Sequence, residues 1–138
     1  MNKRFIDFYM DVAKRTAQMS RAVRLQVGAI VVKDNRIISI GYNGMPSGWD
    51  NTCEHTVDNE LKSKPEVLHA ETNSLMKLAR TTESGLDATM FITHSPCLDC
   101  AKGIYQAGIK EVYYANEYRD TAGIEFLQKC GILVERYK

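Results

Sequence analysis

The chain has 138 residues, of which 44% are hydrophobic and 25% are charged, and this size and composition suit a single domain over residues 1–138 with one core. A net charge of +1 argues against extensive binding to nucleic acid or to an anionic membrane, both of which favour strongly basic proteins. No apolar run approaches the roughly 20 residues of a membrane span. Asp7 and Asp11 stand where a signal peptide needs its apolar segment, so we expect a cytoplasmic protein.

The first half of the chain predicts a helix followed by a hairpin. An amphipathic helix is expected over about residues 2–20, because apolar side chains recur there at helical spacing, namely Phe5, Phe8, Tyr9, Val12 and Met19. Two strands, about 27–33 and 36–42, follow and are joined by a tight turn near Asp34. The polar loop over about residues 43–66 is long for a compact domain, and such loops are usually functional or disordered.

The second half alternates between helical and strand patterns. Helices are predicted over residues 70–80, 97–108 and 121–131, and strands over residues 88–93, 110–115 and 132–137. Alternation of this kind implies right-handed crossovers and parallel strands. The first hairpin would add an antiparallel edge. We therefore predict an α/β fold with a mixed five-stranded sheet and helices on both faces.

Two short clusters carry residues that bind zinc in catalytic sites. His69, Cys97 and Cys100 supply three ligands, which leaves the fourth position of a tetrahedral zinc for water. Cys97 and Cys100 are three residues apart at a helix start, so their sulfur atoms share one face, and a helix N-terminus favours thiolate over thiol. In a reducing compartment such a pair is more often a metal or redox site than a crosslink.

The spacing of His69 and Glu71 constrains where their helix begins. In the middle of a helix, two residues this far apart point about 200° from each other. Both can face one metal only if His69 lies at the start of the helix. Ser63-x-x-Glu66 resembles a capping box, but it would start the helix too early, and we treat it as a chance match or as a separate turn.

Glu71 has a distinct use beside a water molecule that zinc activates. Zinc lowers the pKa of such a water to roughly 7, and a nearby carboxylate takes its proton and delivers it elsewhere. Hydrolytic deamination needs this transfer, because a ring nitrogen gains a proton and ammonia leaves. The order H-x-E followed by P-C-x-x-C is the known signature of zinc nucleobase deaminases.

Each cluster alone also has a simpler interpretation. A single HAE sequence is usually surface or core, and a single CxxC is also typical of a redox pair or of half a structural zinc knuckle. A structural site would need a fourth ligand, for which His55 and His94 are candidates. The two clusters at successive helix starts, with a strand between them, favour catalytic zinc. Cys130 is interpreted as a small buried apolar residue.

Four stretches resemble deoxycytidylate (dCMP) deaminases: "SRAVRLQVGAIVV" (20–32), "GYNGMPSG" (41–48), "HAETN" (69–73) and "SPCLDCAKGIYQAGIKEVYY" (95–114). The resemblance implies the three-layer αβα sandwich of cytidine deaminases and conversion of dCMP to dUMP and ammonia for thymidylate synthesis. It also implies a homo-oligomer, commonly a hexamer, that dCTP activates and dTTP inhibits, each with Mg²⁺. "GYNGMPSG" is the discriminating motif, because the other two short motifs are shared by many deaminases.

The same resemblance assigns roles to single residues. His69, Cys97 and Cys100 correspond to the zinc ligands and Glu71 to the proton shuttle. The substrate-binding positions correspond to Arg24, Asn43, Ala70, Ser95, Tyr118 and Arg119. Arg24 is the first candidate and Arg119 the second for the phosphate group, which arginine pairs with bidentately. The effector nucleotide loop corresponds to Gly44, Met45, Pro46, Ser47 and Gly48, whose backbone N–H groups suit a triphosphate.

Some predictions are negative or have an open alternative. Cys53 and His55 lie in the loop where some relatives bind a second, structural zinc, but we expect no second metal because a full ligand set is lacking. His94 is interpreted as a strand-end histidine in preference to a contact to the base. The alternative functions are a related deaminase that acts on a free base, a nucleoside or RNA, and a non-catalytic zinc module with four protein ligands.

Overall fold

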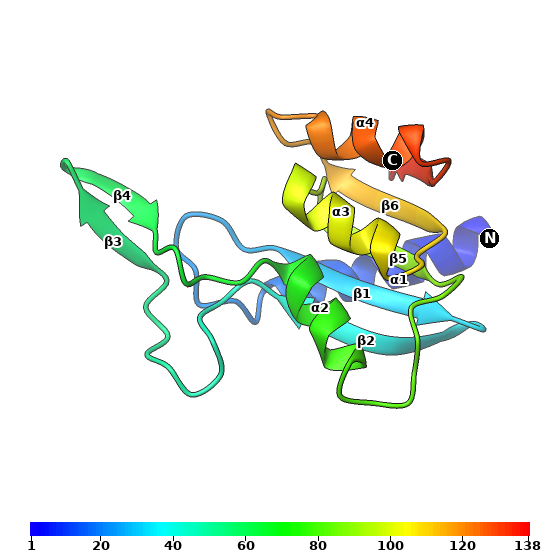
Figure 1. The fold of residues 1–138 in the computed structure, drawn as a ribbon, viewed down its shortest axis with the longest axis horizontal. Coiled ribbons are helices and arrows are strands. Elements are labelled where there is room, and N and C mark those ends of the chain that lie inside the picture. The colour runs from blue at the N-terminus through cyan, green and yellow to red at the C-terminus, as the bar shows by residue number, and fades with distance from the viewer.

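A computed structural model describes residues 1–138 and has a five-stranded sheet at its centre (Figure 1). In chain order the elements are α1 (Lys3–Ala17), β1 (Gly28–Lys33), β2 (Arg36–Tyr42), β3 (Glu54–Val57), β4 (Glu60–Ser63), α2 (Ala70–Leu78), β5 (Thr89–His94), α3 (Leu98–Gln106), β6 (Glu111–Asn116), α4 (Ala122–Lys129) and β7 (Leu133–Arg136). The strand order is β2-β1-β5-β6-β7. β1 is antiparallel to β2 and β5, whereas β5, β6 and β7 are parallel. The predicted mixed sheet is confirmed.

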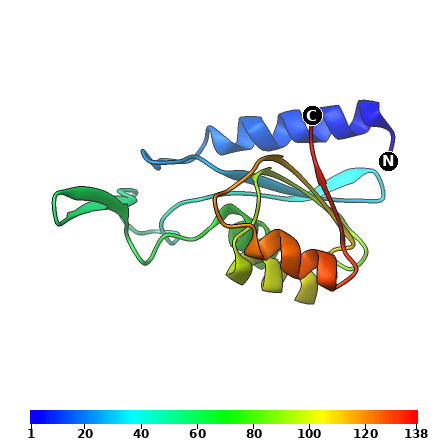
Figure 2. The same cartoon turned by 90° about the horizontal axis from the view of Figure 1, so that it is seen from above.

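Helices cover both faces of the sheet. Figure 2 shows α1 on one side and α3 and α4 on the other. Alternate residues of β1 divide between two cores: Ile30 packs with residues of α1, whereas Val31 packs with residues of α2, α3 and α4. A strand that is covered on both faces is buried along its length, and the first five residues of both β1 and β5 are buried. The three-layer αβα arrangement is therefore confirmed.

The N-terminal helix forms as predicted, and small residues form the part of it that lies against β1. Its buried residues are Tyr9, Met10, Ala13, Thr16 and Ala17, whereas Phe5, Phe8 and Met19 are exposed. A Cβ atom on Gly28 would lie 2.2 Å from the carbonyl oxygen of Ala13, so the helix backbone lies directly against β1. Only small side chains fit at so close a contact. Of the apolar residues whose spacing predicted the helix, Tyr9 is buried together with these small residues.

The loop predicted over residues 43–66 contains a second hairpin, β3–β4. Its turn residues Asp58 and Asn59 have φ values of 51° and 62°, and the predicted turn at Asp34 and Asn35 has values of 51° and 57°. Positive φ at two successive residues defines the type I′ hairpin turn, which Asn and Asp tolerate. The same Asp-Asn pair thus marks both hairpins. β3–β4 extends away from the sheet (Figure 1).

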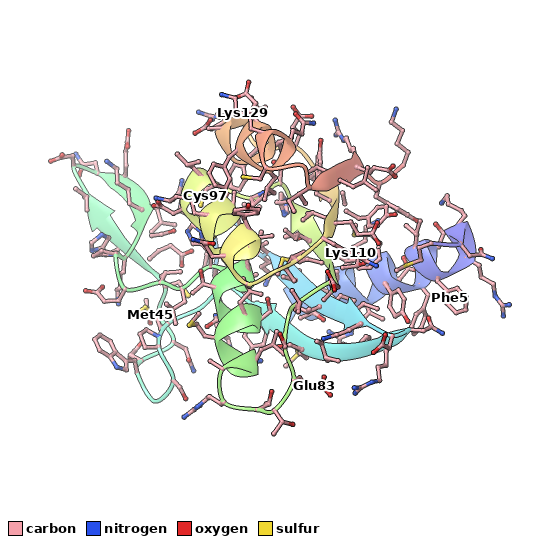
Figure 3. The ribbon with its side chains drawn as sticks, turned by 45° about the vertical axis from the view of Figure 1, so that its right-hand side comes forward. Phe5, Met45, Glu83, Cys97, Lys110 and Lys129 are labelled. Carbon is pink, nitrogen blue, oxygen red and sulfur yellow. The ribbon has the colours of Figure 1, made fainter.

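The topology brings the ends of several elements to one side of the molecule. α3 begins just after β5 ends, and in Figure 3 Cys97 lies at the opposite end of the sheet from Lys110, which precedes β6. The carboxyl ends of parallel strands are the usual location of ligand sites in α/β sheets. No helix combines the length and hydropathy that crossing a membrane requires.

Candidate active site

Two helix N-termini supply the cluster of metal-binding side chains. His69 is the N-cap residue of α2 and Cys97 is the N-cap residue of α3, and both have extended backbone conformations. An extended N-cap residue is free of the helical side-chain directions, so His69 and Glu71 need not point apart. α2 therefore begins directly after His69, as the spacing of His69 and Glu71 predicted. Ser63 ends β4 and caps no helix.

The nitrogen and sulfur atoms of the cluster lie close to the separations found in a zinc site. His69 Nδ1 lies 3.2 Å from Cys100 Sγ and 3.6 Å from Cys97 Sγ, and the three ligand atoms lie within 4.8 Å of one another. A tetrahedral zinc with ordinary bond lengths separates its nitrogen and sulfur ligands by about 3.6 Å. The residues fit a zinc ion. His55 and His94 are not part of the cluster, so the cluster offers three protein ligands, one fewer than a tetrahedral structural zinc site needs.

Close packing of α4 fixes the position of Cys97. A Cβ atom on Gly123, in the first turn of α4, would lie 2.1 Å from the carbonyl oxygen of Pro96 and 2.9 Å from that of Cys97. The absence of a side chain at Gly123 therefore allows α4 to pack on the turn that carries the ligand. Cys97 Sγ in turn accepts a hydrogen bond from the backbone N–H of Cys100 (3.5 Å).

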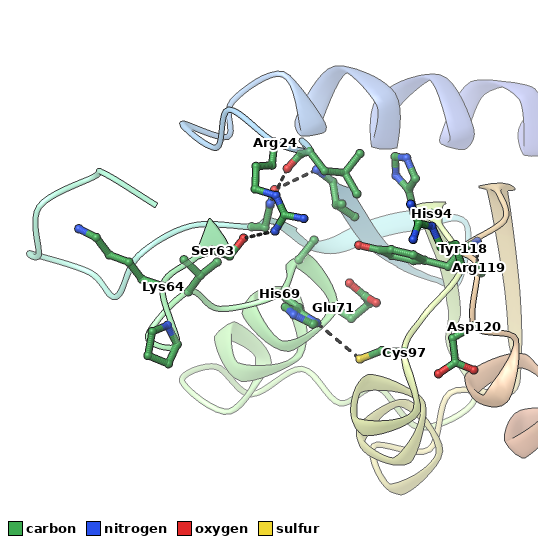
Figure 4. A pocket seen from close by; sticks show the side chains of 17 residues that line it. Arg24, Ser63, Lys64, His69, Glu71, His94, Cys97, Tyr118, Arg119 and Asp120 are labelled. Carbon is green, nitrogen blue, oxygen red and sulfur yellow. Dashed lines mark hydrogen bonds between the residues drawn. The ribbon is translucent and has the colours of Figure 1, made fainter. Parts of the chain in front are cut away.

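Glu71 is buried beside this cluster, and Figure 4 shows its carboxyl group between His69 and Tyr118. Burial raises the pKa of the Glu71 carboxyl to about 7. A bound divalent cation would oppose this shift by stabilising the carboxylate. A buried carboxyl group whose pKa lies near neutrality is suited both to accept and to release a proton.

Burial also raises the pKa of the Cys100 thiol, and the charges of Glu71 and Cys97 raise it further. Without a cation, this cysteine is therefore a neutral thiol. A metal ion must displace its proton, so binding of the metal releases protons and becomes weaker as the pH falls. The free state of all four cysteines agrees with a metal site and not a crosslink.

A cavity of about 800 Å³ lies above the cluster, a volume in the range of small-molecule sites. Nine residues with predicted site roles line it: Arg24, Asn43, His69, Ala70, Glu71, Ser95, Cys97, Tyr118 and Arg119. Cys100 is buried, with its Sγ beside His69. The Gly44–Gly48 segment, for which an effector role was predicted, does not line the cavity. Instead Gly44 N donates to Leu68 O (3.1 Å) and Leu68 N donates to Gly44 O (2.8 Å), so the loop is joined to the residue before His69.

Asn43 holds the segment that precedes β1. Its Nδ2 donates to the carbonyl of Leu25 (2.8 Å), and its Oδ1 accepts from the N–H of Val27 (2.9 Å). A carboxamide has two donor hydrogens and two acceptor lone pairs, so half of its capacity is left for a ligand. Asn43 thus shapes the wall that carries Arg24 in addition to facing the cavity.

Ser95 fixes the segment that closes the other side of the cavity. Its buried Oγ accepts a hydrogen bond from the backbone N–H of Tyr118 (2.8 Å). The Tyr118 ring lies 6.2 Å from the His94 ring, centroid to centroid. Burial raises the pKa of Tyr118, and Glu71 raises it further, so its phenol remains a neutral donor. His94 also bonds with Thr93 Oγ1 (3.0 Å), so it is a paired strand-end histidine that nevertheless lines the cavity.

Three polar residues of the cavity wall were missed by the sequence analysis, namely Ser63, Lys64 and Asp120. Ser63 ends β4 and Lys64 follows it, within the stretch that was interpreted as a loop. The second Asp-Asn pair, Asp58-Asn59, could have predicted this position. A hairpin turn there brings the residues after the second strand next to the residues before the first strand. Lys64 N donates to the carbonyl oxygen of Cys53 (2.8 Å), which places Lys64 directly beyond the base of the hairpin.

The remaining cysteine and histidine predictions concern residues outside the cavity. Cys53 is buried, with its thiol 3.6 Å from the carbonyl oxygen of Asn51. His55 is exposed on β3. Cys130 is the C-cap residue of α4 and is only half-buried.

An αβα sheet with a His-Cys-Cys cluster and a buried glutamate at two helix N-termini is the arrangement of zinc-dependent nucleobase deaminases. Residues 3–116 match the family model described as "Cytidine and deoxycytidylate deaminase zinc-binding region". The chain belongs to this family.

Named relatives agree with the family assignment. The chain is 37% identical to human deoxycytidylate deaminase over 152 residues, which cover 93% of this chain and 83% of that protein. A crystal structure of dCMP deaminase from the cyanophage S-TIM5, in complex with dCMP and dUMP, is 47% identical, covers 99% of both chains and gives a TM-score of 0.94. A bifunctional deaminase/reductase from Thermotoga maritima is 25% identical, with a TM-score of 0.73 over 96% of this chain and 36% of that one. The predicted resemblance to dCMP deaminases is confirmed.

The contact between α4 and the ligand turn yields a prediction. Gly123→Ala forces the turn of Pro96 and Cys97 to shift, so we expect zinc affinity to fall by about 10-fold or more, as for other changes that displace a ligand's support. The measurement is competition for zinc against a coloured chelator. Gly103→Ala on α3 is the matched control, because its Cβ would meet nothing within 4 Å and it stabilises the helix by about 0.5–1 kcal/mol. Equal zinc affinity in the two variants would contradict this role of α4.

Proposed function

We propose that the protein is a zinc-dependent hydrolase that converts dCMP to dUMP and ammonia. The single observation that carries this proposal is the cavity itself. Its floor holds His69, Cys97 and Glu71, and its rim carries Arg24 and Lys64. A floor suited to hydrolysis and a cationic rim suited to a phosphate group together fit a nucleoside monophosphate. The relatives named as deoxycytidylate deaminases support the choice of base and sugar.

The proposed chemistry assigns one task to each group on the floor. Zinc held by His69, Cys97 and Cys100 supplies Lewis-acid activation of a water molecule. Hydrolysis forms a C–O bond at C4 of the cytosine ring and breaks the C–N bond to the amino group. Of the two protons of water, one goes to ring nitrogen N3 and the other leaves with ammonia. Glu71, buried within the cavity, carries these protons.

The walls of the cavity hold the substrate in this proposal. The backbone N–H of Ala70, in the first turn of α2, has no acceptor within the helix and is proposed to donate to the pyrimidine carbonyl. Asn43 contacts the sugar side through its free hydrogen-bonding capacity, and Tyr118 covers the base. The phosphate group is bound by the predicted residues Arg24 and Arg119 and also by Lys64, all of which line the cavity.

We also propose that the effector nucleotides of the family act through the Gly44–Gly48 loop, dCTP as activator and dTTP as inhibitor, each with Mg²⁺, in a homohexamer. Support comes from the two hydrogen bonds between Gly44 and Leu68. Leu68 precedes His69, and Asn43 precedes Gly44. A ligand that moves the loop therefore acts on one residue of the zinc site and on one residue of the substrate wall. A cytoplasmic location belongs to the proposal, since the ligand thiols require a reducing compartment.

The two alternative functions are less well supported. A structural zinc module would need a fourth protein ligand, and only three lie together. A free base or a nucleoside has no phosphate group to bind the cationic rim of the cavity. A transfer-RNA deaminase structure is related to this chain only by its fold, with 23% identity and a TM-score of 0.54.

The substrate class is tested by ammonia release from dCMP, dCTP, deoxycytidine and cytidine, measured side by side. We expect turnover of dCMP well above that of both nucleosides, because only a nucleotide engages the rim of Arg24 and Lys64. A zinc chelator should abolish all turnover, and added zinc should restore it. Deaminating deoxycytidine as efficiently as dCMP would overturn the nucleotide assignment. If the zinc-loaded protein released ammonia from none of these substrates, the proposal that it is a deaminase would be wrong.

The role of Glu71 is tested by Glu71→Gln, which retains the size of the side chain and removes its ability to carry a proton. We expect kcat to fall by at least about 100-fold, the usual size of a general acid–base contribution. Zinc content should stay at one ion per chain, since His69, Cys97 and Cys100 are unchanged. Glu66→Gln, on the polypeptide leading to α2 but outside the cavity, is the control and should retain full activity. A Glu71→Gln protein with normal turnover would remove Glu71 from the mechanism.

Regulation is tested by dCMP saturation curves at several fixed dTTP concentrations. We expect dTTP to make the curves sigmoidal and dCTP to return them toward hyperbolic form, since coupled subunits share the change of state. Gly44→Ala should weaken both effects. A Cβ at Gly44 meets nothing within 4 Å, so the fold should tolerate this change. Competitive inhibition with hyperbolic curves, unaltered by Gly44→Ala, would mean that dTTP only occupies the active site.

A further inference from the structure

Glu54 is a buried carboxylate in an otherwise exposed hairpin. It is the first residue of β3 and is only 8% exposed, whereas every residue of β4 is exposed. None of the ion pairs in the structure involves it. A buried carboxylate without a cationic partner is costly unless hydrogen bonds satisfy it. The hydrogen-bond partners of Glu54 therefore indicate its role.

Those partners are two successive backbone N–H groups. Glu54 Oε2 accepts from the N–H of Val23 (2.9 Å) and from the N–H of Arg24 (3.1 Å). Successive N–H groups that converge on one anion form a favourable charge-assisted arrangement. Residues 21–27 form neither helix nor strand, so no regular structure fixes the backbone from which Arg24 extends. Glu54 supplies that restraint, and Asn43 restrains the residues that follow.

The side chain of Arg24 contacts the same rung of the hairpin. Glu54 and Ser63 are paired across β3 and β4, and Arg24 Nη1 donates to Ser63 Oγ at 3.5 Å. Figure 4 shows the guanidinium directed toward Ser63, above His69 and Glu71. One end of the hairpin thus holds Arg24 twice, by its backbone and by its guanidinium. The base of the hairpin is also continuous with Lys64, the second cation of this wall.

We propose that Glu54 is a positioning residue that orients Arg24 toward the anionic group of a nucleotide, and that it thereby sets the preference for a phosphorylated substrate over the free nucleoside. This inference rests on the proposed function. Glu54 itself does not line the cavity, so it acts through Arg24. A guanidinium that is already in place loses less conformational freedom when the phosphate binds. Glu54 therefore affects binding of the phosphate group and does not affect the reaction at the pyrimidine ring.

The test compares Glu54→Ala and Glu54→Gln with Glu60→Gln, a control on the exposed part of the same hairpin. For Glu54→Ala we expect KM for dCMP to rise about 10-fold, the usual effect of losing hydrogen bonds to a charged group, with kcat within about twofold. The kcat/KM for deoxycytidine should not change. Glu54→Gln should show a smaller rise, because its carboxamide oxygen still accepts. It also serves as the test if the alanine variant does not fold.

A double-mutant cycle with Arg24→Ala identifies the route of the effect. If Glu54 acts through Arg24, Glu54→Gln adds nothing to the KM of the Arg24→Ala protein. Additive effects, an unchanged KM, or equal losses with dCMP and deoxycytidine at reduced zinc content would each overturn the proposal. The proposed function fails differently, since a wild-type protein that releases no ammonia from dCMP would refute both. An active wild type with an unaffected Glu54→Gln variant refutes only the positioning role.

Discussion

The rest of the structure depends on the convergence of two helix N-termini at one point. His69 and Cys97 are both N-cap residues with extended backbones, and this conformation lets a ligand and the residues of the first helical turn face the same cavity. A helix N-terminus also carries partial positive charge, which would partly offset the cost of ionising the buried Cys100 thiol when a cation binds. The order strand, turn and helix is therefore a requirement of the site and not only of the fold.

Glycine at contacts between layers makes this convergence possible. A Cβ on Gly41 would lie 2.6 Å from the carbonyl oxygen of Ala70, and a Cβ on Gly123 would overlap the turn that contains Cys97. β2 therefore lies directly against the first turn of α2, and α4 lies directly against the start of α3. Each of the two ligand-bearing helix ends is held by a neighbouring backbone. Close-packed backbones have few alternative arrangements, which gives the cluster a fixed geometry before any ion binds.

The sequence predicted those features that depend on local rules. Element order, the mixed sheet and the first hairpin turn followed from periodicity and from Asp34-Asn35, and the position of His69 at a helix start followed from the angle between successive helical residues. Features that depend on distant contacts were missed. The small residues of α1 that pack against β1 were not identified, because the close approach at Gly28 is not a local property. Lys64 was overlooked because its place in the wall requires the β3–β4 hairpin to return to its base.

The cavity has two halves that are built differently. The floor is formed by N-cap residues and first-turn residues of helices, so its atoms are fixed by secondary structure and by glycine contacts. The wall with Arg24 is formed by irregular backbone that side chains hold from outside, through Asn43 Oδ1 to Val27 and Glu54 Oε2 to Val23 and Arg24. Such a wall can change its ligand by a few substitutions without disturbing the metal ligands. Under the proposed function, this separation places the determinants of substrate choice on the segments before β1 and at the base of β3–β4.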